Sequence, residues 1–169
     1  MRMIFMAALI AAATVVSAQT PDLSGTWQLD ESRSNVVATA GIIGLIPAGA
    51  PRTLHITHSA NGTIVIESQI NEAHARIYRP GKETSTPAGQ GGAVTATSRW
   101  EGASLVIDGA LKAPNGDTTT VREVLSLGAG GTLTMAVTTG GNASSTLIYT
   151  KITDVGPCST WPTPCKRAP

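Results

Sequence analysis

The side chains best suited to metal or acid–base chemistry are sparse in this chain of 169 residues. Its three histidines are His55, His58 and His74. Successive side chains of an extended strand alternate between its two faces, so His55 and His58, three positions apart, point to opposite sides. They therefore cannot bind one metal ion together, and we expect no metal site.

Enzymatic catalysis also lacks a matching pattern. A serine nucleophile needs a histidine and an acid held in register, and the Gly-x-Ser-x-Gly turn is missing from the sequence. Glu101, Asp108 and Asp117 fall at expected turns, where carboxylates normally meet water. The glycine-rich residues 89–92 are not followed by the Lys-Ser or Lys-Thr of a phosphate loop. We expect no catalytic residue, no cofactor and no enzyme.

Four side chains are candidates for contact with a small molecule: Tyr78, Trp100, Arg122 and Met135. Tyr78 and Met135 could line a cavity, although Met135 fits a plain hydrophobic core equally well. Arg122 points to one face of its expected strand, and the opposite face holds Val121, Leu125 and Leu127 together with Glu123. If that set faces the core, Arg122 lies outside. In a wide and wet barrel, Arg122 could instead face inward and hold an anionic head group.

The N-terminus has the pattern of a secretory signal peptide. Arg2 precedes an apolar run over residues 4–16, and Val16 and Ala18 are small enough for a peptidase site before Gln19. The run is shorter than the roughly 20 apolar residues that span a bilayer. We expect cleavage of residues 1–18 and export to the periplasm or beyond, leaving a domain over 19–152 and a tail over 153–169.

Charge and cysteine content narrow the choice of partners. Without Arg2 the chain keeps eleven basic and eleven acidic residues, which argues against a nucleic-acid or anionic-membrane partner. Cys158 and Cys165 lie in the proline-rich tail, with six residues between them. Because an exported chain meets an oxidising compartment, we expect these two to form a local disulfide.

The rest of the chain alternates apolar and polar residues over short segments separated by tight turns, as at Asn61-Gly62. This pattern predicts an all-β, antiparallel, up-and-down barrel of roughly eight to ten strands. The expected strands cover 25–30, 53–58, 63–70, 73–79, 83–86, 94–100, 105–107, 118–127, 133–137 and 146–152. Residues 31–52 lack alternation, so we expect a short helical turn and an apolar loop, either a lid over a cavity or a plug in one barrel end.

Gly25-Thr26-Trp27 at the start of the first strand resembles the Gly-x-Trp signature of lipocalins. Residues 22–152 also resemble exported bacterial lipocalin-like proteins of unassigned function, through the short motifs at 22–27, 98–102, 125–127 and 149–151. The resemblance implies a calycin-type barrel in which Gly25 and Trp27 close one end. It also implies a basic side chain from a late strand, Lys151 or Arg122, packed on the indole.

The same resemblance implies a function. An exported lipocalin-like barrel would bind a small apolar or amphipathic ligand in its interior. The alternatives are a structural or protein-interaction barrel with a filled core, and an enzyme that uses the barrel mouth. Two features depart from lipocalins: no helix is evident before the last strand, and the cysteine pair closes only on itself.

Overall fold

The computed structural model describes residues 20–37, 42–43, 46–47, 50–69, 73–87, 93–112, 115–140 and 143–153. These residues form twelve strands and no helix. The strands are β1 (Gly25–Leu29), β2 (Ile42–Ile43), β3 (Ile46–Pro47), β4 (Thr53–His58), β5 (Ile64–Gln69), β6 (Ala73–Tyr78), β7 (Glu83–Pro87), β8 (Ala93–Glu101), β9 (Ser104–Lys112), β10 (Thr118–Leu127), β11 (Thr132–Thr139) and β12 (Ala143–Thr153). The signal segment and both cysteines lie outside the described residues.

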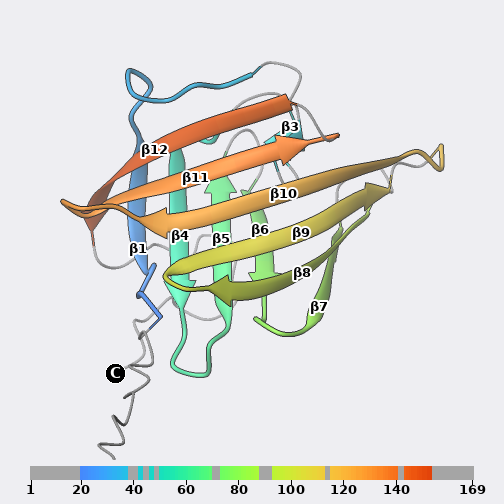
Figure 1. The fold of residues 1–169 in the computed structure, drawn as a ribbon, viewed down its shortest axis with the longest axis horizontal. Helices are drawn as coiled ribbons and strands as arrows, with labels where there is room; N and C mark the ends of the chain where they lie inside the picture. Colours follow the sequence, from blue (N-terminus) through green and yellow to red (C-terminus); the bar gives the residue numbers. More distant parts are fainter. Residues whose placement is uncertain are drawn as a thin grey trace, which may run out of the picture.

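Ten of the strands form one antiparallel sheet in the order β6-β5-β4-β1-β12-β11-β10-β9-β8-β7. The first strand pairs with the last, with Trp27 opposite Lys151, and its other edge pairs with β4. The sheet bends into two walls: β8 to β12 cross in front of β1 and β4 to β6 (Figure 1). The prediction of an up-and-down barrel is therefore confirmed.

The two ends of the ladder, β6 and β7, lie side by side and make the barrel nearly closed. The turn between them holds the ends together, because the Gly81 N–H donates to the Ser98 carbonyl on β8 at 2.7 Å. Within the described residues, the hydrogen-bonded ladder does not continue from β6 to β7.

Alternation of side chains creates the core. On β11 the buried positions are Leu133, Met135, Val137 and Thr139, with partly exposed residues between them. Two large aromatic side chains, Trp27 and Tyr149, lie in the core and satisfy their polar atoms locally. Trp27 Nε1 donates to the Leu23 carbonyl at 3.0 Å, and the Tyr149 hydroxyl donates to the Pro51 carbonyl at 3.1 Å. Each such buried side chain contributes about 1.5–3 kcal/mol.

The connection after β1 differs from expectation. Its described part contains a turn at residues 31–33, a bridge between Asn35 and Thr146, and the short pair β2–β3. Residues 42–43 and 46–47 are extended where a helical turn or loop was expected, because the β-branched isoleucines of β2 and β3 favour extended backbone. For the rest of 31–52 the helical turn stays a prediction. Whether residues 31–52 cover a cavity or plug an end stays a prediction, since several of them lie outside the description.

The tight turn at Asn61-Gly62 is confirmed. Gly62 has φ +79°, a conformation that favours glycine, and its N–H donates to the Ser59 carbonyl at 2.9 Å. None of the described residues belongs to a helix long and apolar enough to cross a membrane.

Candidate functional site

An ion pair between Arg76 and Glu123 spans the interior of the barrel. Arg76 lies on β6 and Glu123 on β10, in opposite walls, and each side chain is only 2% exposed. Arg76 Nη1 donates to both carboxylate oxygens, at 2.7 and 2.8 Å. Both residues take inward-facing positions because they alternate in phase with buried neighbours on their strands, such as Tyr78 and Leu125.

The surroundings of this pair keep it charged and dry. Burial alone would lower the pKa of Arg76, but the Glu123 carboxylate raises it and outweighs that effect, so the guanidinium stays protonated. The Arg76 guanidinium lies 5.7 Å from the centre of the Tyr78 ring. Burial raises the pKa of the Tyr78 and Tyr149 phenols, and both remain neutral.

Arg76 keeps unused hydrogen-bonding capacity. Its Nε and Nη2 atoms are buried with no acceptor at hydrogen-bond distance among the described residues, and the Tyr78 phenol is a weaker polar neighbour of the guanidinium. The hydroxyls of Ser98 and Thr139 are also buried, and neither has a hydrogen-bond partner among the described residues. Ser98 lies level with Glu123, since both pair with Ile107 from either side of β9. An unpaired buried polar group costs about 1–3 kcal/mol, so the free edge of Arg76 suits an additional hydrogen-bond acceptor.

A pocket of about 470 Å³ opens at one end of the barrel. His58 and Trp100 stack in it, with ring centroids 5.8 Å apart and planes at 27°. Arg79 and Lys82 in the β6–β7 turn form part of its rim. Trp100 is one inward-facing position beyond Ser98, so a single layer of side chains separates this pocket from the level of Glu123.

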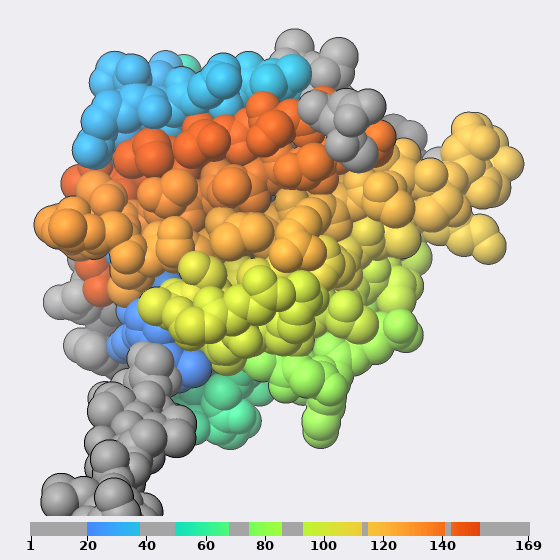
Figure 2. All heavy atoms as spheres, in the orientation of Figure 1, coloured from blue at the N-terminus to red at the C-terminus, as the bar shows by residue number. Residues whose placement is uncertain are grey.

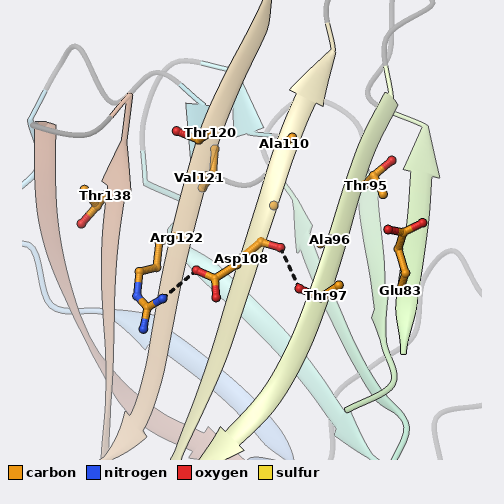
Figure 3. A pocket seen from close by; sticks show the side chains of 11 residues that line it. Glu83, Thr95, Ala96, Thr97, Asp108, Ala110, Thr120, Val121, Arg122 and Thr138 are labelled. Carbon is orange, nitrogen blue, oxygen red and sulfur yellow. Dashed lines mark hydrogen bonds and ion pairs between the residues drawn. The ribbon is translucent and has the colours of Figure 1, made fainter. Parts of the chain in front are cut away.

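The second hollow, of about 570 Å³, lies on the outer face of β7 to β11 (Figure 3). Arg122 lines it and donates to Asp108 Oδ1 at 2.8 Å, and Arg99 binds the other oxygen of the same carboxylate. Those arginine bonds lower the pKa of Asp108, against burial, which raises it. The inward placement of Arg122 is wrong, because Val121 and Glu123 on either side of it take the buried phase. Arg122 therefore cannot hold a head group inside the barrel.

The remaining predicted residues divide between core and barrel end. Met135 is fully buried in the hydrophobic core, and Trp100 is partly buried at the open end. The nitrogen of Lys151 stands 5.3 Å from the centre of the Trp27 ring, and Gly25 lies beside them on β1 with φ +141°. Of the two basic candidates, Lys151 is the one that contacts the indole.

Arg76 was missed in the sequence, and Glu123 was noted only for its phase. The available signal was a charged residue on the same strand face as core residues. Glu123 is two positions from both Val121 and Leu125, and Arg76 is two positions before Tyr78. Alternation identifies the inward face of each strand separately. It does not show that these two strands oppose each other across the interior.

Solved structures with the same architecture are numerous, and all those described here share little sequence with this chain. A fatty acid transporter described as REP1-NXSQ aligns with a TM-score of 0.58 at 16% identity, over 77% of this chain and 96% of that one. Apo lipid binding protein 8 from Caenorhabditis elegans gives 0.58 at 14%, over 76% and 94%. The chain therefore shares the antiparallel β-barrel fold of these proteins.

A third relative in structure is the fatty acid binding protein of Schistosoma mansoni in complex with arachidonic acid. It aligns with a TM-score of 0.55 at 18% identity, over 76% of this chain and 95% of that one. No protein-family model matches the sequence, and no curated protein sequence matches it either. At these identities the likeness establishes the fold alone.

Proposed function

We propose that this protein is a carrier that holds a small amphipathic molecule inside its barrel, with the polar end of the molecule at Arg76. One observation carries the proposal: Arg76 Nε and Nη2 are buried donors with no acceptor in the described part of the chain. A ligand oxygen placed there would remove the cost of leaving them unpaired. Its apolar part would gain about 25 cal/mol for each Å² removed from water.

The comparisons support this proposal. The structural relatives described above are named as fatty acid or lipid binding proteins, and their barrels superimpose on most of this chain. A carrier needs a shaped interior and no reacting residues. That requirement agrees with the few chemically reactive side chains that the sequence offers.

The end pocket is the proposed route to the interior. On the face drawn in Figure 2, side chains of β9 to β12 form an almost continuous surface, hollowed where Arg122 and Asp108 lie on its outside. The pocket at His58 and Trp100 lies at a barrel end instead, one layer from the Glu123 level. Replacing Trp100 with alanine would widen this end and speed both binding and release.

A displacement assay tests the carrier function. The protein is titrated with Nile red, a neutral dye that brightens in apolar surroundings, and the bound dye is competed with unlabelled amphiphiles. The key variant, Arg76→Gln with Glu123→Gln, removes both interior charges together and keeps polar side chains at both positions. The matched control is Arg122→Gln, which removes an arginine from the outer face.

We expect competition in the wild-type protein and in the Arg122→Gln control, and weaker competition in the interior double variant. Equal loss in the control and the double variant would place the ligand elsewhere. Failure of every amphiphile to displace the dye would refute the carrier function and favour a barrel with a filled core.

We also propose that the chain is exported, loses residues 1–18 and joins Cys158 to Cys165. The N-terminal charge and apolar run support export, and export supports the disulfide. Expression in a bacterium with fractionation, followed by intact-mass measurement with and without a reductant, tests both points. A chain retained in the cytoplasm with Met1 in place would refute the export.

A further inference from the structure

The charge inside the barrel is already balanced. Arg76 and Glu123 are each 2% exposed, and one guanidinium nitrogen contacts both carboxylate oxygens. A buried ion pair in such close contact leaves no net charge for a ligand to neutralise. Any ionised group that enters this site therefore adds a new, uncompensated charge.

Arg76 can still donate hydrogen bonds to an acceptor. Nη1 is engaged with Glu123, while Nε and Nη2, on the other edge of the guanidinium, are buried without an acceptor among the described residues. The N–H groups on that edge are fixed in one plane and can converge on one oxygen, because a carbonyl oxygen has two lone pairs. The Ser98 hydroxyl, level with Glu123, is a further buried group that can either donate or accept.

A carboxylate would fit this edge in shape but not in charge. It would share Arg76 with Glu123, so two negative groups would face one positive group in surroundings from which water is excluded. Like charges in such a site repel, and an unpaired buried charge is costly. A neutral acceptor receives the same hydrogen bonds without that penalty.

From this we propose that the preferred ligand is an uncharged amphiphile whose polar end is a carbonyl group, such as an ester, amide or ketone, and not a carboxylate anion. This inference rests on the proposed carrier function and specifies its ligand class. Glu123 is the residue that determines the preference, because it occupies the charge of Arg76.

The test compares ligands that share one hydrocarbon chain and differ only in the head group. Methyl oleate, oleamide and oleate compete against Nile red at neutral pH. In the wild-type protein we expect the ester and the amide to bind at least about tenfold more tightly than the anion, which corresponds to about 1.4 kcal/mol. Lowering the pH until the acid is neutral should bring its affinity close to that of the ester.

A single substitution should reverse the order. Glu123→Gln keeps an acceptor beside Arg76 and removes the negative charge, so the interior gains a net positive charge that favours oleate. The outer-face variant Arg122→Gln should leave the ratio of the affinities unchanged. Circular dichroism identifies any variant that is not folded, and the wild-type pH series then decides by itself.

The outcomes separate this inference from the carrier function. Oleate binding as tightly as the ester in the wild-type protein would overturn the inference and leave the carrier function standing. The inference would also fail if folded Glu123→Gln kept the wild-type order. If none of the three compounds binds, both the carrier function and its ligand class are refuted.

Discussion

Removing one partner of the interior ion pair is expected to destabilise the barrel far more than removing both. Glu123→Leu leaves the Arg76 guanidinium charged in a place where it is 2% exposed. Loss of one member of a buried pair costs about 3–5 kcal/mol, and Arg76→Met should cost a similar amount. The double variant, Arg76→Met with Glu123→Leu, leaves no buried charge and also removes the unpaired donors Nε and Nη2. Its stability should lie within about 1 kcal/mol of the wild-type value or above it.

Urea unfolding followed by circular dichroism measures these differences. With a urea dependence of about 2 kcal/mol per M, each single variant should lower the midpoint by roughly 2 M. Because a domain of this kind has only about 5–15 kcal/mol of stability, all variants are compared in the same concentration of sucrose. The control Arg122→Gln disrupts an ion pair whose members are half exposed and should move the midpoint little.

A cost below about 1 kcal/mol for Glu123→Leu, as for an exposed ion pair, would refute the prediction. The prediction also fails if the double variant is as unstable as the two single variants combined, because the charges would then act independently. Either result would mean that water reaches the pair.

Three further predictions concern other parts of the barrel. Burial lowers the pKa of His55 in the folded chain, against the opposing effect of Glu67, so the unfolded chain takes up a proton first and stability should fall as the pH drops below 6.5. The urea midpoint of His55→Asn should lack this part of the pH dependence. Parallel curves of midpoint against pH for the variant and the wild type would contradict the prediction. Lys151→Met should lose the contact over the Trp27 ring, at a cost of about 0.5–2 kcal/mol in thermal unfolding, and an unchanged melting temperature would show that the contact is not stabilising. Gly62→Ala should cost about 1–2 kcal/mol because φ is +79°, and a stability equal to wild type would mean that the turn adopts another conformation.

Most of the fold follows from the sequence because each strand carries its own signal. A strand such as Leu133 to Val137 buries every second residue, and tight turns such as Asn61-Gly62 fix where the chain reverses. A meander then needs only neighbouring pairs, and the remaining pairing of β1 with β12 joins its first and last strands. The secondary structure of residues 31–52 is harder to predict from the sequence, because their apolar residues follow no single period that would separate a helical turn from short strands.

The candidate site was less predictable than the fold. Alternation correctly assigns the residues of β10 to its two faces. It did not decide which face is inside, because Arg122 would face inward in a wide, water-filled barrel. The structure instead puts Glu123 inside, where it is tolerable only because Arg76 reaches it from the opposite wall. That compensation joins residues 47 positions apart in the chain, and no local pattern encodes it.

The unpaired edges at β6 and β7 give the Arg76–Glu123 contact a second consequence. A strand with a neighbour on one side only is among the first parts of a sheet to open, and its amides exchange with solvent deuterium early. The ion pair joins Arg76 on β6 to Glu123 on β10 across the barrel, so it tethers one of the two edge strands. A ligand that weakened this ion pair would make β6 open more often, and a ligand that strengthened it would slow its own release.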